Sequence, residues 1–355
     1  MNAAVQMLRV APELCEPAES QTNDALLQAL YDLCRSMRGS CGFVDPFVLW
    51  SRLIVQFPTF GELNDRGQPM QHDAQEALNA LLQRVSESLP EPRKGLVCGR
   101  LKQTMTCKDD PEEEAPMVQE VPFLMLPCNI NVTIQTLEAG LEAAFNEEVS
   151  LPSEKLAREA LFTRLSRVSV LPEYLFIHLV RFSWRADIQS KVKILKPVTF
   201  PMVLDLYALC TEELKTSMQP QRIRITEQRD KELERRRAAK TKTELNEEIK
   251  VDESVNSEAN TATAPAPAAG VSAGNESGYY ELCGVISHKG RSADSGHYVF
   301  WGKYGTQWLI FDDAHVAQVS EEDVKRLRGV GEAHIAYVLM YRSRDPSTGR
   351  AVTPY

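Results

Sequence analysis

The first ninety residues carry apolar side chains at intervals of three and four positions, which is the spacing of one helix face. This pattern predicts four helices, the first over residues 1–10 and broken near Pro12. Asn23 or Asp24 would cap the second, and Asp45 would cap the third, with Pro46 at its first helical position. The apolar positions that define the last three helices are Leu26, Leu27, Leu30, Leu33 and Met37; Leu49, Leu53 and Ile54, before Pro58; and Leu78, Leu81, Leu82 and Val85.

After residue 94 the pattern changes to shorter runs that are typical of strands. Strands are predicted over residues 94–107, 121–128, 168–170, 174–182, 279–288, 297–301, 308–311 and 333–342, with one short helix over residues 133–145. The run 174–182 is largely apolar and fits a central strand, so His178 within it is expected to be a packed sheet residue. Helices followed by strands indicate an α+β fold.

An interruption separates the strand-like segments. Residues 222–248 are densely charged, which is compatible with a solvated helix, and residues 254–274 have the Ala, Ser, Thr, Asn and Pro composition of a disordered linker. Because strand patterns lie on both sides, we interpret residues 222–274 as an insertion within one domain of residues 1–345, followed by a tail over residues 346–355.

Composition narrows the classes of protein that the chain can belong to. A net charge of −9 argues against a nucleic-acid-binding protein, and no apolar run approaches the 18 residues of a membrane-spanning helix. The first residues lack the pattern of a signal peptide, so the eight cysteines are expected to be reduced thiols in the cytoplasm or nucleus. None of them forms a Cys-x-x-Cys pair, so a structural zinc site has little support.

The strongest candidate for chemistry is His297, which follows the small residues Ser295 and Gly296 at the start of a predicted strand. A catalytic imidazole needs a partner on one ring nitrogen while the other acts as the base. The next strand ends in Asp312 and Asp313, and either carboxylate could be this partner. Alternation along a strand would let only one of them point at the histidine.

A second polar segment, Gln71-His72-Asp73-Ala74-Gln75-Glu76, opens the fourth predicted helix. Asp73 as the N-cap and Glu76 three residues later would suffice to explain both acids as a capping arrangement. The alternative is an acidic lip that binds a basic peptide. The spacing alone does not decide between these two interpretations.

Together these segments resemble the ubiquitin-specific proteases, a family of papain-like cysteine proteases with thumb, palm and finger subdomains. The matching segments are Gln71 to Glu76, Phe176-Ile177-His178-Leu179-Val180-Arg181-Phe182, Ser295-Gly296-His297-Tyr298-Val299, Trp308, Phe311-Asp312-Asp313 and Ala336-Tyr337-Val338-Leu339-Met340-Tyr341. Details such as Asp205-Leu206-Tyr207 and Gly290-Arg291-Ser292 resemble a proteasome-associated member of the family.

The resemblance implies a helical thumb, an antiparallel palm and fingers, and thiol-dependent hydrolysis of isopeptide bonds at the terminal glycine of ubiquitin. His297 would be the general base and Asp312 its orienting partner. Asp73 and Glu76 would hold the basic ubiquitin tail in a cleft that also contains Gln71, Gly296, Tyr298 and Tyr337. Residues 183–193 and 291–296 would form loops over this cleft. The implied partners are ubiquitin, polyubiquitinated proteins and the 26S proteasome. No nucleic acid, no membrane, no cofactor and no metal is implied.

The family's nucleophile segment reads Gly-Asn-Thr-Cys-Tyr-Met-Asn, and the chain opens with Met1-Asn2. The resemblance therefore places the catalytic cysteine two positions before Met1, and the chain as given is expected to be inactive alone. One alternative, which we favour, is a longer protein that carries this cysteine and a ubiquitin-like domain upstream. The other is a chain that binds ubiquitin without cleaving it. Cys15 lies past the end of the first predicted helix and is not expected to substitute.

Overall fold

The computed structural model of the chain describes residues 1–16, 23–39, 42–64, 67–109, 115–131, 133–153, 156, 158–185, 189–247, 274–290, 296–329 and 334–344. Four main helices form the amino-terminal part, with their bounds at α1 (Asn2–Leu8), α2 (Ala25–Gly39), α3 (Phe47–Gln56) and α4 (Ala74–Ser88). They are joined by the short helical turns η1 (Pro12–Leu14) and η2 (Pro58–Gly61) and are followed by α5 (Glu91–Lys94).

Aspartate side chains fix where these helices begin. Asp24 accepts hydrogen bonds from the backbone N–H groups of Leu26 and Leu27 at 2.8 and 3.2 Å, and Asp73 accepts one from Gln75 N–H at 2.7 Å. These bonds satisfy donors that the first turn of a helix leaves unpaired. No helix in the described ranges has the length and apolarity that crossing a membrane requires.

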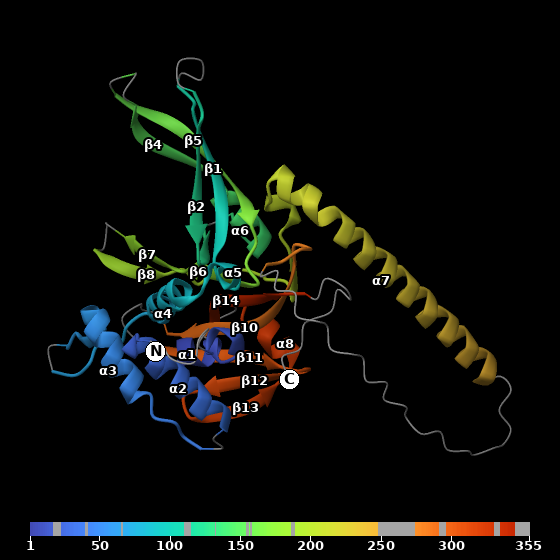
Figure 1. Ribbon diagram of the computed structural model, residues 1–355, viewed down its shortest axis with the longest axis horizontal. Helices are drawn as coiled ribbons and strands as arrows, with labels where there is room; N and C mark the ends of the chain where they lie inside the picture. The colour runs from blue at the N-terminus through green and yellow to red at the C-terminus, as the bar shows by residue number, and fades with distance from the viewer. Residues whose placement is uncertain are drawn as a thin grey trace.

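An eight-stranded sheet forms the centre of the molecule (Figure 1). Its order is β13 (His315–Val319), β12 (Gln307–Asp312), β11 (His297–Tyr304), β10 (Tyr279–Lys289), β14 (Ile335–Ser343), β6 (Tyr174–Val180) and β3 (Met125–Asn129), and β9 (Val203–Asp205) pairs with β10. All pairs are antiparallel except β3 with β6. One face packs on α1, α2 and α4, and the other on α6 (Leu137–Ala144) and α8 (Glu321–Arg326).

A four-stranded antiparallel sheet projects from this body (Figure 1), in the order β2 (Met117–Phe123), β1 (Gly99–Cys107), β5 (Arg158–Val170) and β4 (Asn146–Ser153). Between the two sheets, β7 (Phe182–Arg185) and β8 (Ser190–Lys193) form a hairpin. The predicted loop over residues 183–193 thus contains two short strands, with residues 186–188 outside the described part of the chain.

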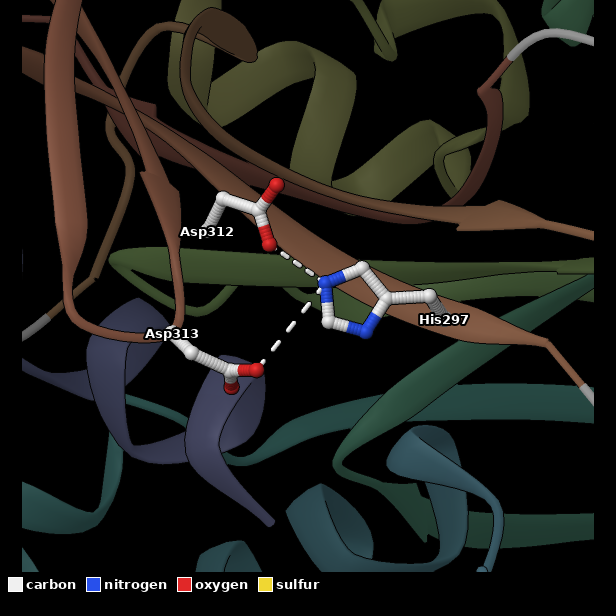
Figure 2. A group of neighbouring side chains, drawn as sticks. All are labelled: His297, Asp312 and Asp313. Carbon is white, nitrogen blue, oxygen red and sulfur yellow. Dashed lines mark hydrogen bonds and ion pairs between the residues drawn. The ribbon is translucent and has the colours of Figure 1, made fainter.

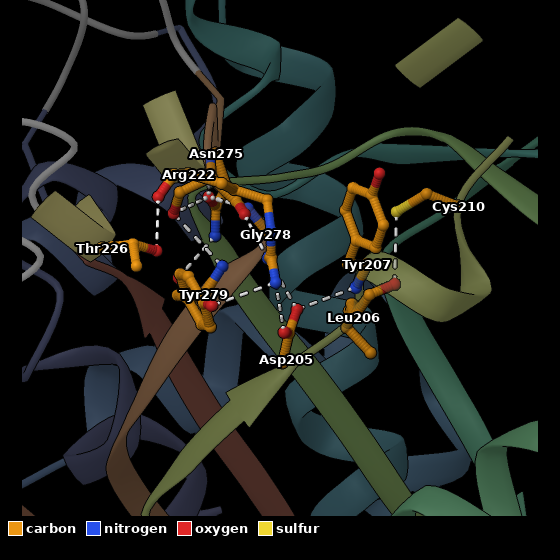
Figure 3. Close-up of polar contacts among 10 residues, drawn as sticks. Asp205, Leu206, Tyr207, Cys210, Arg222, Thr226, Asn275, Gly278 and Tyr279 are labelled. Carbon is orange, nitrogen blue, oxygen red and sulfur yellow. Dashed lines mark hydrogen bonds and ion pairs between the residues drawn. The ribbon is translucent and has the colours of Figure 1, made fainter. Parts of the chain in front are cut away.

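The long helix α7 (Glu212–Glu247) extends away from the body (Figure 1) and is anchored at Arg222. The Arg222 guanidinium donates to both carboxylate oxygens of Asp205 at 2.9 and 2.7 Å. It also lies between the rings of Tyr207 and Tyr279, 4.4 and 4.2 Å from their centroids (Figure 3). The charged helix was expected to begin at residue 222, but it begins ten residues earlier, at Glu212. Its first turns pack on the body through the buried Met218.

Several predicted elements differ from the structure. The helix predicted over residues 133–145 is Leu137–Ala144, and the strand predicted over residues 174–182 ends at Val180. Residues 94–98 form the end of α5 and a turn, because Pro90 and Pro92 favour a helical turn there. The predicted strand 121–128 is two strands, β2 and β3, that belong to different sheets. Strands β4 and most of β5 were missed, since strands with one or both faces exposed carry too few apolar residues to give a clear alternating pattern.

Candidate active site

His297 is the first residue of β11 and lies beside the end of β12. Its Nε2 donates a hydrogen bond to Oδ1 of Asp312, the last residue of β12 (Figure 2). This bond holds the pKa of the Asp312 carboxyl below its ordinary value. It also fixes the proton of the neutral imidazole on Nε2, so the other ring nitrogen, Nδ1, is left as a proton acceptor.

Asp313 approaches the same nitrogen, with its Oδ2 4.0 Å from Nε2 of His297 (Figure 2). It lies in the turn after β12 with a φ of 49°, beyond the strand. The expectation that only one aspartate could point at the histidine was therefore wrong, because strand alternation does not apply past the strand end. Two side chains of α1 hold this turn by hydrogen bonds. Asn2 Nδ2 donates to the Asp313 carboxylate at 2.8 Å, and Gln6 Nε2 donates to the Asp313 carbonyl oxygen at 3.1 Å.

The start of α4 faces the tyrosines of the central sheet. Asp73 caps the helix and also accepts a hydrogen bond from the Tyr337 hydroxyl, while Glu76 is exposed on the first turn. Burial, and then the negative charges of Asp73 and Glu76, raise the pKa of the hydroxyls of both Tyr298 and Tyr337. The capping interpretation of Asp73 is confirmed, and the same carboxylate brings negative charge close to both tyrosines.

Gly296 precedes His297 and lies where a side chain would not fit. Its φ is 149°, and a Cβ atom there would be 2.3 Å from Nε2 of His288 and 2.5 Å from the carbonyl oxygen of Lys289. Its own carbonyl accepts a hydrogen bond from Nε2 of Gln71 at 3.0 Å. Gly296 and Gln71 thus connect the segment before α4 to the residue that delivers His297, whereas residues 291–295 lie outside the described chain.

Behind Gly296, a buried lysine supports the end of β10. Lys193 donates to Nδ1 and the carbonyl of His288 at 2.7 and 3.0 Å and to the carbonyl of Gly290 at 2.9 Å. Burial lowers the pKa of Lys193 to about 8 and that of His288 to about 4. Neither residue was singled out from the sequence, because their roles depend on contacts between elements that no local pattern encodes.

A pocket of about 230 Å³ opens beside His297. It is bordered by Met1, Asn2 and Ala3 of α1, by Trp50 and Leu53 of α3, by Phe60, Met70, Gln71, His72 and Ala77, and by Tyr298 and Asp313. The amino-terminal end of α1 and His297 therefore face one hollow. No described cysteine lines it, and Cys15 is buried beyond η1, as its place in the sequence predicted.

The ligand atoms of His297, Asp312 and Asp313 lie within 4.8 Å of one another, so within the described residues this group alone could hold a metal ion. Exposed acidic groups are common without one. The hydrogen bond from Nε2 to Asp312 uses the nitrogen that a metal would need. We therefore interpret the group as a histidine with its carboxylate partners.

A helical unit, an antiparallel sheet and a carboxylate-held histidine at their junction define the class of papain-like cysteine proteases. A family model described as ubiquitin carboxyl-terminal hydrolase matches residues 1–341. Ubiquitin carboxyl-terminal hydrolase 6 of Schizosaccharomyces pombe is 35% identical, over 97% of this chain and 76% of the relative. Proteins called ubiquitin carboxyl-terminal hydrolase 6 in Arabidopsis thaliana and 14 in Caenorhabditis elegans are each 32% identical over 97% of this chain, and over 76% and 71% of their own lengths.

The chain therefore belongs to the ubiquitin carboxyl-terminal hydrolase family, and its fold is the α+β, papain-like catalytic domain of the ubiquitin-specific proteases. The predicted family and fold class are confirmed. The roles of His297, Asp312, Gln71, Asp73, Glu76, Gly296, Tyr298 and Tyr337 stay predictions. Gln71, His297 and Tyr298 line the same pocket, and hydrogen bonds join Asp312 to His297, Gln71 to Gly296 and Tyr337 to Asp73.

Gly296→Ala tests how the histidine is delivered. The added methyl group would collide with the His288 ring and the Lys289 carbonyl, so we expect a lower thermal midpoint and weaker ubiquitin binding, both measurable on the chain as it stands. Gly305→Ala is the matched control, because Gly305 has a φ of 59° with nothing within 4 Å of its Cβ position. Equal effects of the two substitutions would show that backbone strain alone is responsible and would contradict the packing argument.

Proposed function

We propose that the protein cleaves the isopeptide bond after the carboxyl-terminal glycine of ubiquitin, with His297 as the general base and Asp312 as its orienting partner. A cysteine thiolate at the amino-terminal side of α1 would attack the glycine carbonyl. His297 would then give the proton to the leaving lysine amine, and water would release ubiquitin from the acyl-enzyme. The observation that carries the proposal is that Met1, Asn2 and His297 border the same pocket.

The thiolate would lie near the amino-terminal end of a helix, where the helix dipole lowers the pKa of a thiol. A histidine beside it lowers that pKa further. Nδ1 of His297 supplies the partner, since Nε2 is committed to Asp312. The arrangement therefore favours a thiolate–imidazolium pair, which is the reactive form of a cysteine protease.

Substrate binding is proposed to use the acidic start of α4. Burial, and then the negative charges of Asp73 and Glu76, raise the pKa of the Tyr298 and Tyr337 hydroxyls, and Tyr298 lines the pocket beside His297. A basic peptide such as the ubiquitin tail is attracted by this charge. Gln71, Gly296, Tyr298 and Tyr337 would line the path of the tail.

We further propose that the enzyme acts on polyubiquitinated proteins at the 26S proteasome, in the cytoplasm or nucleus. The support is the resemblance of Asp205-Leu206-Tyr207 and Gly290-Arg291-Ser292 to a proteasome-associated member of the family. Co-purification of the tagged full-length protein with proteasome subunits tests this part. Absence of proteasome subunits from the purified protein would contradict this part of the proposal and would leave the proposed hydrolysis unaffected.

The second candidate function is ubiquitin binding without cleavage. It is favoured by the observation that no described cysteine lines the pocket, although Gln71, His297 and Tyr298 do. Both candidates predict that the chain binds ubiquitin. They differ in whether a cysteine placed upstream of Met1 makes the site reactive.

The deciding experiment adds Gly-Asn-Thr-Cys-Tyr before Met1 and compares this chain with a matched version carrying Ala in place of that Cys. Both are incubated with ubiquitin whose carboxyl terminus carries an electrophile, and the adduct is measured by intact mass. Labelling of the cysteine version alone supports the hydrolase. Absence of labelling, together with retained ubiquitin binding by calorimetry, would favour the binding function, and loss of both would contradict both candidates.

A further inference from the structure

Two buried cysteines of the helical unit lie in direct contact. Cys15, immediately after η1, and Cys34, in α2, have their sulfur atoms 3.0 Å apart. Both residues are buried, with exposed fractions of 2% and 1%. The Cys15 thiol also donates to the carbonyl of Leu8, the last residue of α1, at 3.3 Å.

The other thiols of the described chain have different surroundings. Cys98, Cys210 and Cys283 each donate to a backbone carbonyl, at 3.6, 3.3 and 3.3 Å respectively. Among the described cysteines, only Cys15 and Cys34 have sulfur atoms in contact with each other. Neither lines the pocket beside His297, so the pair is separate from the candidate active site.

We propose that Cys15 and Cys34 form a reversible intramolecular disulfide when the protein meets a peroxide oxidant. One thiolate attacks the peroxide, which gives a sulfenic acid and releases water or an alcohol. The second thiol then displaces water from the sulfenic sulfur as the S–S bond forms. The two cysteines are thereby oxidised by two electrons, which the peroxide accepts. A disulfide is about 2.0 Å long, so the sulfurs need to approach by only about 1 Å.

The buried setting determines how readily this occurs. The contact with Cys34, and then burial, raise the pKa of the Cys15 thiol well above its ordinary value, so little thiolate is present at neutral pH. Oxidation therefore requires local opening around η1 and is expected to be slower than oxidation of an exposed thiol. A slow, reversible pair of this kind differs from the permanent disulfides of secreted proteins.

The bond would fasten the segment that follows α1 to α2. It closes a loop from residue 15 to residue 34, which restricts the unfolded chain and stabilises the folded one. Since Asn2 and Gln6 of α1 hold the Asp313 turn beside His297, the oxidised bond stabilises the helical unit that borders the pocket. The proposal goes beyond the proposed hydrolysis and does not depend on it.

Intact mass after graded exposure to hydrogen peroxide tests the proposal on the full chain. Trypsin releases residues 10–35 as one peptide that contains both cysteines, and glutamyl endopeptidase cleaves between them after Glu19. We expect the tryptic peptide of the oxidised chain to be lighter by two hydrogen atoms. After the second digestion its two cysteine-containing fragments should remain joined by the disulfide, and dithiothreitol should separate them and restore both hydrogen atoms. The thermal midpoint of the oxidised chain should rise by a few degrees.

Cys15→Ala and Cys34→Ala should each abolish both changes, whereas Cys107→Ala, which removes an equally buried thiol of β1, should retain them. Addition of oxygen atoms to residues 10–35 without loss of two hydrogens would overturn the proposal. So would a peptide that stays unlinked after prolonged exposure to peroxide, long after the partly exposed Cys98 is fully oxidised. Neither result would bear on labelling by the ubiquitin probe, so the two proposals fail independently.

Discussion

Replacing His297 with alanine, in the chain completed by the upstream cysteine, is expected to lower kcat for a ubiquitin–aminocoumarin substrate by about a thousandfold or more. The imidazole would both hold the thiol as a thiolate and return the proton to the leaving group, and such roles account for several orders of magnitude in rate. KM should change little, because the predicted tail contacts lie on Gln71, Asp73 and Glu76 rather than on His297. Steady-state kinetics with both parameters resolved is the measurement.

The two aspartates provide a matched comparison within this experiment. Asp312→Asn alters the partner that is hydrogen-bonded to Nε2, whereas Asp313→Asn alters a carboxylate 4.0 Å away. We expect a loss of roughly a hundredfold or more in kcat for Asp312→Asn and a clearly smaller loss for Asp313→Asn. A larger effect at Asp313 would reverse the assignment and show that the turn held by Asn2 and Gln6 supplies the orienting group.

The helical half of the fold could be predicted closely, because its signals are local. The apolar spacing from Leu26 to Met37 and the cap at Asp24 correspond to α2, and Asp73 begins α4 as expected. The central strands were equally clear, since β6 is buried on both faces and reads as a continuous apolar run. Strands β4 and β5 were not, since they are only partly buried and, apart from Val168, their own buried apolar residues contribute only to a small cluster around Ala160 and Phe162.

For the site, sequence indicated which residues matter but not how they are held. His297 was identified from its small preceding loop and the acids one strand later, and the choice of Asp312 required the resemblance to a family. The contribution of α1 through Asn2, Gln6 and the Asp313 turn joins residues about three hundred positions apart. Pairings of this range depend on how the elements pack, which a pattern of neighbouring residues does not contain.

Acid is expected to unfold the protein through two buried histidines, His178 of β6 and His288 of β10. Burial lowers the pKa of each from 6.5 to about 4, and the Lys193 ammonium against His288 opposes a second positive charge there. Between pH 6.5 and 4 the unfolded chain therefore binds more protons than the folded one, so the free energy of unfolding falls as the pH drops. By pH 4 each of the two histidines lowers the free energy of unfolding by about 3 kcal/mol, whereas above pH 7 neither lowers it.

Urea unfolding at pH 7, 6, 5 and 4.5 measures how the free energy of unfolding depends on pH. Replacing one histidine with a residue that cannot bind a proton shows how much of this dependence that histidine causes. His178 packs edge-on against Tyr337 with ring centroids 4.9 Å apart, and its buried Nε2 makes no hydrogen bond within the described chain. His178→Phe should keep that packing while removing about half of the histidine-dependent slope. His315→Gln, on the exposed β13, should leave the slope unchanged. If His178→Phe and His315→Gln behaved alike, His178 would not contribute, and the acid sensitivity would have to come from His288 or from carboxylates such as Asp312, whose pKa is lowered. Stability from a carboxylate of this kind is also lost as the pH falls.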